Sequence, residues 1–233
     1  TCLMILRGLR SSAVTNVFPG EDGEHDKDGR IQVCTVEGIE IWTTYVPNSG
    51  WSSQSHARRE KWDERVLSAL ERRRLRMDGG ERVSPLIWAG DMNVCREDRD
   101  ASHVNFFRHT IYRIRKNYHI PTDKNNKGQP GVIPSEQRRF REALRKGDLI
   151  DAYRMFHPEL DRDKDFTWRG CPPVTGSKKA LYYGKGMRID YTLVSSSIKG
   201  QVLRADTCGR GQERDGFMGS DHCPVVLVAQ MLR

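Results

Sequence analysis

Short apolar runs between polar or glycine-containing segments predict the strands of a sheet. The first two runs are rich in β-branched and aromatic residues, and Glu37-Gly38 between them predicts a tight hairpin. Later runs are apolar over most of their length, as expected of buried strands. The runs occupy residues 31–36, 39–46, 85–89, 166–170, 188–194 and 224–228.

Apolar residues at helical spacing predict helices between these strands. Residues 55–77 carry apolar side chains three and four positions apart with arginines elsewhere, which predicts a helix covering one face of the sheet. Phe107 belongs to a similar pattern over residues 106–118, and Ser135 is the expected N-cap of a helix over residues 134–144. Strands and helices alternate without a strict βαβ period, which favours layered mixed sheets in one α/β domain.

Composition narrows the class of protein. The 233 residues suffice for one large domain, and no apolar run approaches the length of a membrane span. Six cysteines are scattered without the spacing of a disulfide framework or zinc site, which favours a reducing compartment. The net charge is +8, and residues 101–150 hold eleven basic and four acidic side chains. Such an excess suits a polyanionic partner, although a solvated surface is the simpler explanation.

Acidic and imidazole side chains stand at the ends of three predicted strands. Asp221-His222 directly precede the last run, Asp91 follows the third, and Asp190 lies inside the fifth. Because an unpaired carboxylate is costly to bury, Asp190 needs a cationic or proton-bearing partner, and His222 is the natural candidate. Such a pair is typical of a general acid or a phosphate-contacting histidine, with a structural pair or a polar turn as the alternative.

Four short motifs occur in order along the chain: Tyr-Val-Pro-Asn at 45–48, Gly-Asp-Met-Asn-Val at 90–94, Arg-Ile-Asp-Tyr at 188–191 and Gly-Ser-Asp-His-Cys-Pro at 219–224. Together they resemble the exonuclease III family of apurinic/apyrimidinic-site DNA endonucleases, over nearly the whole chain. One tetrapeptide is weak support, whereas four in order are strong. The resemblance implies a single domain over residues 1–233 with the DNase I-like fold, a four-layered α/β/β/α sandwich with two mixed β-sheets.

The resemblance also implies catalytic roles. Hydrolysis of a phosphodiester requires an oriented water, neutralisation of charge on the phosphate oxygens and help for the departing oxygen. Asp91 would orient or deprotonate the water, and Asn93 would help to hold it. The His222–Asp190 pair would contact a phosphate oxygen and stabilise its charge, with Tyr45 as a further donor. An Asx turn explains Asp91 and Asn93 equally well when that motif is taken alone.

Substrate-binding and metal roles follow from the same resemblance. The residues expected to contact the substrate are Asn48, Trp168, Met187 and Arg188, although Asn48 with its preceding proline is also ordinary turn chemistry. The cofactor implied is Mg²⁺, with Mn²⁺ as the alternative, since hard ions take few carboxylates together with waters and substrate oxygens. The metal ligands implied are Asp221, Asp91, Asn93 and His222.

The chain departs from the family pattern in three places. Relatives carry Asn-x-Asn-Gly and Gln-Glu motifs upstream of everything seen here, and neither occurs upstream of residue 45 in this sequence. Thr1 leads directly into an apolar run, so we expect an N-terminally truncated domain with a weak metal site. Met187 stands where relatives often place a tryptophan, which predicts a looser pocket for the abasic sugar. The basic segment 102–122 is either a contact to the DNA backbone or a solvated insertion.

The function implied is that of a base-excision repair enzyme that cuts DNA 5′ to an abasic site and leaves a 3′ hydroxyl. Additional 3′–5′ exonuclease or 3′-phosphodiesterase activity stays open. The expected partner is double-stranded DNA with abasic sites, without a membrane. The protein is expected to act as a monomer inside the cell, in the nucleus or mitochondrion of a eukaryote. A non-catalytic nucleic-acid-binding relative and another phosphodiesterase of the superfamily are the alternatives.

Overall fold

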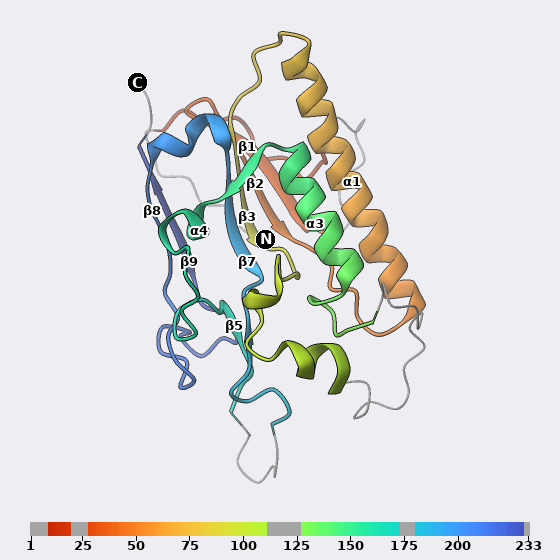
Figure 1. The fold of residues 1–233 in the computed structure, drawn as a ribbon. Coiled ribbons are helices and arrows are strands. Elements are labelled where there is room, and N and C mark those ends of the chain that lie inside the picture. Colours follow the sequence, from red (N-terminus) through yellow and green to blue (C-terminus); the bar gives the residue numbers. More distant parts are fainter. Residues whose placement is uncertain (1–8, 20–27, 111–126, 173–179, 231–233) are drawn as a thin grey trace.

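The centre of the protein is a mixed five-stranded sheet (Figure 1). The computed structural model describes residues 9–19, 28–110, 127–172 and 180–230. The strand order is β1-β2-β3-β7-β4, in which β2 and β3 are parallel and the other neighbours antiparallel. The bounds are Ile31–Val36 for β1, Ile39–Tyr45 for β2, Leu86–Asp91 for β3, Leu149–Asp151 for β4 and Asp190–Ser195 for β7.

Two local features determine how β1, β2 and β3 associate in this sheet. Glu37 and Gly38 have φ angles of 49° and 83°, so the predicted hairpin between β1 and β2 is confirmed. Gly90 has a φ of 133°, and a Cβ at this position would lie 2.0 Å from the backbone oxygen of Thr44. Only glycine therefore permits the close approach of β2 and β3 immediately before Asp91.

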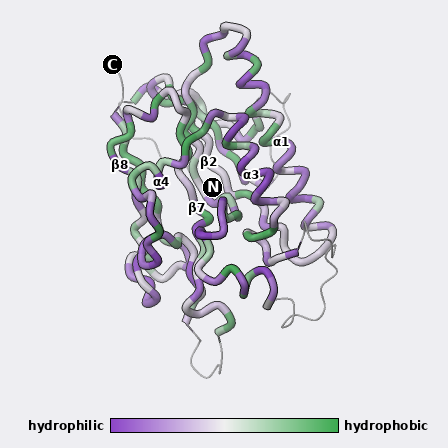
Figure 2. Tube along the Cα trace, in the orientation of Figure 1, coloured by the Kyte–Doolittle hydropathy of each residue, from purple (hydrophilic) through white to green (hydrophobic). Residues whose placement is uncertain are grey.

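Two helices cover one face of the sheet, α1 (Ser53–Asp78) and α3 (Pro134–Lys146), and lie side by side in Figure 1. Ser52 caps α1 through a capping box. The predicted N-cap Ser135 is wrong, because Ile133 holds that position and Pro134, already restricted to helical φ, begins the helix. The shared core includes Trp42, Trp62, Leu70, Trp88, Phe140 and Leu193. Figure 2 shows that α1 is otherwise largely hydrophilic.

The opposite face of the sheet packs against a second, two-stranded sheet of β8 (Val202–Thr207) and β9 (Val225–Ala229). Ile87 points to this side, where it joins Val194, Ala205 and Leu227, whereas the next residue, Trp88, points to the helices. This alternation follows from the two-residue period of a strand. The short helix α4 (Ala152–Phe156) follows β4 and contacts β8.

Shorter elements complete the described part of the chain. A ribbon of β5 (Trp168–Arg169) and β6 (Gly186–Met187) lies beyond the central sheet, and 3₁₀ turns occupy Asp98–Asp100 and Ser196–Gln201. The helix expected over residues 106–118 is described only as a π-helical turn, Phe106–Thr110, and the rest lies outside the described residues. Of the helices that the structure describes, none has the length and apolar character needed to cross a membrane.

Candidate active site

The four sequence motifs meet at one end of the central sheet. β2 and β3 are parallel, so their last residues lie side by side, and Tyr45 is the register partner of Asp91. β7 runs the opposite way, which makes its first residue, Asp190, the partner of Asp91 on the other side. The segment preceding β9 brings His222 to the same place, where it forms an isolated bridge with Trp168. Strand direction therefore places Tyr45, Asp91 and Asp190 together, and the segment before β9 adds His222.

A pocket of about 330 Å³ opens at this end of the sheet. Most of the predicted site residues line it, whereas Asp190 and Arg188 do not. Residues 129–131, which sequence analysis did not assign to the site, form part of the wall. The lining residues are Tyr45, Asn48, Asp91, Asn93, Gln129, Pro130, Gly131, Trp168, Met187, Ile189, Asp221 and His222.

His222 and Asp190 form the predicted pair, with 2.9 Å between Nδ1 and Oδ2. Burial by itself lowers the pKa of His222, but the hydrogen bond and charge of Asp190, with the nearby charge of Asp91, raise the pKa to about 9. The imidazole is therefore protonated at neutral pH. Asp190 holds Nδ1, so Nε2 is the nitrogen left to donate a hydrogen bond toward the pocket.

Thr167 positions both members of this pair and was missed by sequence analysis. Its hydroxyl oxygen accepts hydrogen bonds from the backbone N–H groups of Ile189 and Asp190, at 3.1 Å and 3.0 Å. Its carbonyl oxygen accepts the N–H of Cys223 at 2.8 Å, directly after His222. Thr167 is fully buried. The only indication in the sequence was a threonine between two aromatic residues in a predicted strand. A residue at such a position usually contributes only to packing.

Asn93 organises the opposite side of the pocket. Its side-chain amide group donates to Asp91 Oδ2 and to the carbonyl of Val46, and its backbone N–H donates to Asp91 Oδ1. Asn48 in turn donates to Asn93 Oδ1 at 3.0 Å. Asn93 has a φ of 49°, a left-handed conformation that asparagine tolerates better than most residues. Both amide hydrogens are thus used inside the protein, which leaves one lone pair of Oδ1 for a ligand.

Asp91 is the most perturbed carboxylate of the pocket. Burial and the neighbouring charge of Asp190 raise the pKa of Asp91 from 3.8 to about 7, against the lowering effects of His222, Asn93 and Arg59. The group is thus close to half-protonated at neutral pH. A carboxyl with this pKa is well suited to accept a proton from water.

The arrangement also fits a divalent cation. Among the residues that the structure describes, ligand atoms of Asp91, Asp190 and His222 lie within 4.8 Å of one another. The Nδ1 of His222 is bound to Asp190, and the role of His222 as a ligand stays a prediction. Hard divalent cations prefer oxygen, which the two carboxylates supply. Positive charge between them would relieve the repulsion that raises the Asp91 pKa.

The Asp91 proton links stability to pH. An unfolded chain releases this proton near pH 3.8, whereas the folded protein holds it until about pH 7. Between these values the folded state binds more protons, so the free energy of unfolding falls as pH rises. Asp91→Asn, which does not ionise, is expected to be more stable than the natural protein by up to roughly 4 kcal/mol at pH 8 in EDTA. Urea denaturation from pH 4 to pH 8 measures the difference.

The advantage of Asp91→Asn should grow between pH 4 and pH 7 and then level off, because both states of the natural protein are ionised above pH 7. Equal stability of the two proteins at pH 8 would contradict a raised pKa of Asp91 in the folded protein.

The remaining predicted residues lie in the pocket wall in different roles. Tyr45 is half-exposed, with Arg30 stacked over its ring at 4.9 Å. Trp168 donates its indole N–H to Asp221 Oδ2 at 3.1 Å. Asp221 is not part of the carboxylate–imidazole group, so its role as a metal ligand stays a prediction. Met187 is buried in the wall near Gly131.

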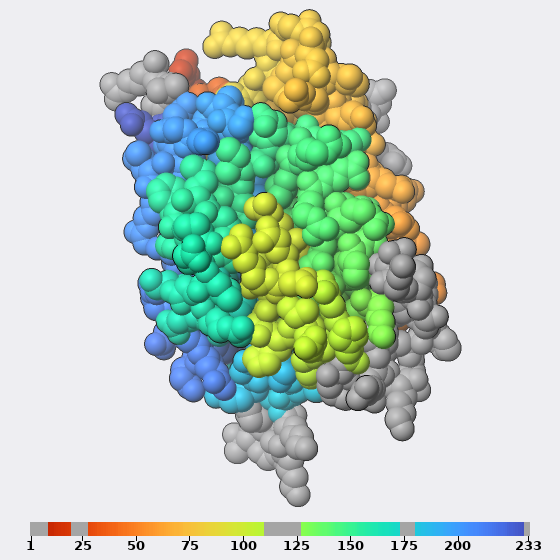
Figure 3. All heavy atoms as spheres, viewed as in Figure 1, coloured from red at the N-terminus to blue at the C-terminus, as the bar shows by residue number. Residues whose placement is uncertain are grey.

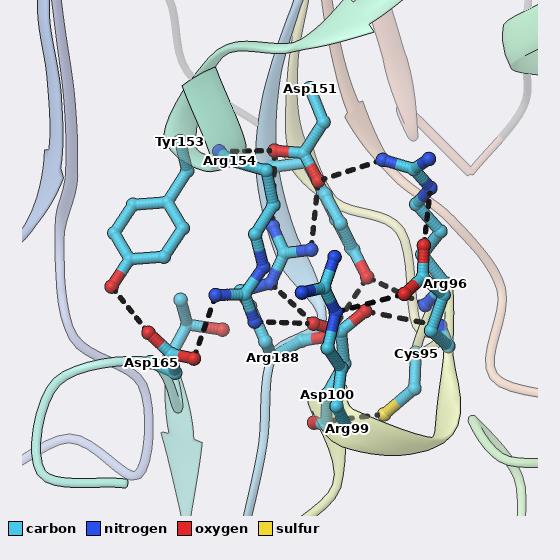
Figure 4. A network of polar contacts seen from close by, with 12 residues as sticks. Cys95, Arg96, Arg99, Asp100, Asp151, Tyr153, Arg154, Asp165 and Arg188 are labelled. Atoms are coloured by element: carbon cyan, nitrogen blue, oxygen red, sulfur yellow. Dashed lines mark hydrogen bonds and ion pairs between the residues drawn. The ribbon is translucent and has the colours of Figure 1, made fainter. Parts of the chain in front are cut away.

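Arg188 is not a substrate-binding residue, contrary to the prediction. Its side chain is 1% exposed and does not line the pocket. It forms ion pairs with Asp100 and Asp151 in a buried network (Figure 4). Both carboxylates come from segments far away in sequence, so the motif alone does not show which way the guanidinium points. The tertiary structure assigns Arg188 to the core.

The segment 102–122, predicted either to contact DNA or to be a solvated insertion, is described only up to residue 110. Arg108 pairs with Asp98 and donates to Gln137 at 3.0 Å. Its guanidinium is therefore engaged within the protein. Arg113, Arg115 and Lys116 lie outside the described residues.

The helix-covered mixed sheet and its acid–imidazole pocket define a DNase I-like α/β protein. The chain belongs to the endonuclease/exonuclease/phosphatase family, whose family model matches residues 10–222.

Curated relatives of this chain are named as DNA endonucleases. The chain is 40% identical over 206 residues to a DNA-(apurinic or apyrimidinic site) endonuclease of Arabidopsis thaliana, covering 88% of this chain and 52% of the relative. It is 32% identical to the enzyme of that name from Plasmodium berghei, covering 94% and 39%. The chain thus spans about half the length, or less, of these curated relatives.

Solved structures share the fold. A Neisseria 3′ phosphatase bound to a product DNA hairpin has a TM-score of 0.65 at 20% identity, with 95% of this chain and 72% of that one covered. The AP endonuclease LMAP from Leishmania major has a TM-score of 0.64 at 24% identity, with 95% and 61% covered. At these identities the likeness shows the fold alone.

Proposed function

We propose that this chain is the catalytic domain of a DNA-(apurinic or apyrimidinic site) endonuclease. It would hydrolyse the phosphodiester on the 5′ side of an abasic site in double-stranded DNA and leave a 3′ hydroxyl. The observation that carries the proposal is the pocket in which a protonated His222, paired with Asp190, faces the raised-pKa carboxyl of Asp91. The 40% identity to a relative of that name supports the choice of substrate.

The residues of the pocket suit the two proton-dependent parts of this reaction. Asp91 accepts a proton from the attacking water, and Asn93 holds the Asp91 carboxylate in place through both of its oxygens. The protonated His222 binds a phosphate oxygen through Nε2 and neutralises the charge that develops there. Tyr45 lines the pocket, where its hydroxyl would donate to a second phosphate oxygen. The water oxygen bonds to phosphorus as the P–O3′ bond breaks, and the departing 3′ oxygen takes a proton from solvent water to become a hydroxyl.

Mg²⁺, with Mn²⁺ as the alternative, is the cation that we propose for this pocket, where it would stabilise negative charge on the phosphate. We also propose that the domain acts as a monomer and that the complete fold is the four-layered α/β/β/α sandwich. Three of these layers are supported by the helices α1 and α3, the central sheet and the β8–β9 sheet. The α4 contact with β8 supports the position of the fourth.

Incision of an oligonucleotide duplex with one tetrahydrofuran abasic analogue tests the function. This chain and a longer version of the protein that begins upstream of Thr1 are assayed in Mg²⁺, Mn²⁺ or EDTA, with an undamaged duplex as the control. We expect a single cut 5′ to the analogue in Mg²⁺, no cut in EDTA, and a 3′ end that a DNA polymerase extends. Binding of the damaged duplex without incision by either protein would favour the non-catalytic alternative. Equal cutting of both duplexes would refute abasic-site specificity.

A further inference from the structure

Arg59 is a charged residue on the apolar face of α1. It lies three positions before Trp62 on the stripe that packs against the sheet, and it is 2% exposed. A guanidinium in such a place is costly unless its N–H groups and its charge are compensated. The sequence pattern placed the arginines of this helix away from its apolar positions, and only the structure shows the partners of Arg59.

The Arg59 guanidinium binds the backbone of two separate pocket loops. It donates to the carbonyl oxygen of Pro47 at 3.1 Å, in the loop that follows β2. It also donates to the carbonyl oxygens of Met92 at 3.1 Å and Asn93 at 3.3 Å, in the loop that follows β3. These carbonyls flank the residues that form the pocket, Asn48 on one loop and Asp91 on the other.

The charge of Arg59 is balanced within the two helices. Its Nε donates to Asp63 Oδ1 at 2.8 Å, and Asp63 Oδ2 accepts from Arg139 of α3 at 2.8 Å. Burial lowers the pKa of Arg59, but the charges of Asp63 and Glu136 outweigh this effect and raise it. The guanidinium therefore stays charged, and α1 and α3 hold it in one orientation.

We infer that Arg59 is a positioning residue that sets the distance and orientation between the two catalytic loops. This inference rests on the proposed function for what the loops do, and on the structure for how they are held. Asn93 ties the loops together from the pocket side, through its bonds to Val46 and Asp91. Arg59 ties them from the helix side, on both carbonyls next to the left-handed backbone of Asn93.

Loss of Arg59 would leave buried carbonyl oxygens without donors on both loops. Water or a backbone shift would then replace the lost bonds, and the pocket groups would move relative to one another. A misplacement of about 1 Å lowers the rate of a reaction by about 100-fold without a matching loss of substrate binding. A residue that merely stabilised the fold would lower the melting temperature but leave the rate of the folded protein unchanged.

The test compares Arg59→Met and Arg59→Lys with a control on the same helix, Arg74→Met. Arg74 is half-exposed near the C-terminal end of α1, where it pairs with Asp78. We expect Arg59→Met to lower kcat for incision of the abasic duplex by about 100-fold with KM changed less than about threefold. Arg59→Lys keeps the charge but not the fork of donors, so it should recover only part of the rate. Arg74→Met should behave as the natural protein.

Amide hydrogen exchange supplies a readout that does not depend on catalysis. In EDTA, peptides covering residues 45–50 and 91–95 should exchange faster in Arg59→Met, while β1 stays protected as in the natural protein. Arg139→Met leaves Arg59 in place but removes one hydrogen bond to Asp63, so it should increase the exchange of these peptides less. This variant replaces Arg59→Met in the experiment if Arg59→Met does not fold.

The outcomes separate this inference from the proposed function. If the natural protein does not incise DNA, the exchange experiment still decides whether Arg59 holds the loops. Arg59→Met with natural kcat and natural loop exchange would overturn the inference, even if the protein is an endonuclease. A lower melting temperature with unchanged kcat and exchange would likewise overturn it, because that is the signature of a structural role alone.

Discussion

Replacement of His222 by alanine is expected to lower incision of abasic-site DNA by about 1000-fold or more at pH 7.5. The variant loses the protonated imidazole and leaves Asp190 with an unpaired charge in the pocket. The His222 side chain is about a third exposed, at 32%, and the backbone ladder around it rests on Thr167, so folding should persist. Single-turnover incision with saturating enzyme measures the loss without interference from product release.

The pH dependence distinguishes a charged His222 from a merely positioned one. With a pKa of about 9, the imidazolium is present throughout the neutral range and is lost above about pH 9. The natural protein should therefore lose activity as the pH rises through about 9, and the residual activity of His222→Ala should show no such decline.

Asp190→Asn provides the matched comparison. It removes the charge that raises the His222 pKa while it keeps a hydrogen-bond acceptor, so the alkaline loss of activity should move to lower pH. Because the two residues act as a unit, the double variant should be about as slow as His222→Ala alone. Natural incision by His222→Ala would show that the assigned centre is wrong.

Arg188→Met is expected to destabilise the protein by about 3–5 kcal/mol, the cost of leaving buried carboxylates without their partner. The Arg188 guanidinium lies 2.9 Å from Asp100 and 2.8 Å from Asp151, and all three side chains are 1% exposed. Arg154 adds ion pairs to Asp100 and Asp165, at 2.9 Å and 2.8 Å (Figure 4). In Figure 3 the residues near 100 lie between those of α3 and those of α4. The buried ion pairs therefore connect the segment around Asp100 to α4 and to the start of β7.

Urea denaturation of Arg188→Met at pH 7.5 measures the loss, with Arg204→Met as the control. Arg204 is 65% exposed in its pair with Asp206, and a surface pair contributes no more than about 1 kcal/mol. A loss below about 1 kcal/mol for Arg188→Met would contradict the structural role of the network. A variant that retained its stability but bound DNA weakly would restore the original prediction of a substrate contact.

The local pattern of hydrophobic and polar residues was enough to predict most strands of the central sheet. The apolar runs and the Glu37-Gly38 turn predicted strands that the structure confirms, because strand and turn preferences depend on neighbouring residues. The pairing of Asp190 with His222 was also predictable, since a carboxylate inside an apolar run requires a partner and few candidates existed.

Only the tertiary structure decided which polar residues face the pocket and which lie in the core. Arg188 and Asp190 are two positions apart, yet one side chain pairs with core carboxylates and the other pairs with the pocket histidine. Arg59 and Thr167 find their acceptors and donors on segments distant in sequence. Hydrogen bonds of this kind depend on how helices and strands pack in three dimensions, and no local pattern of hydrophobic and polar residues contains that information.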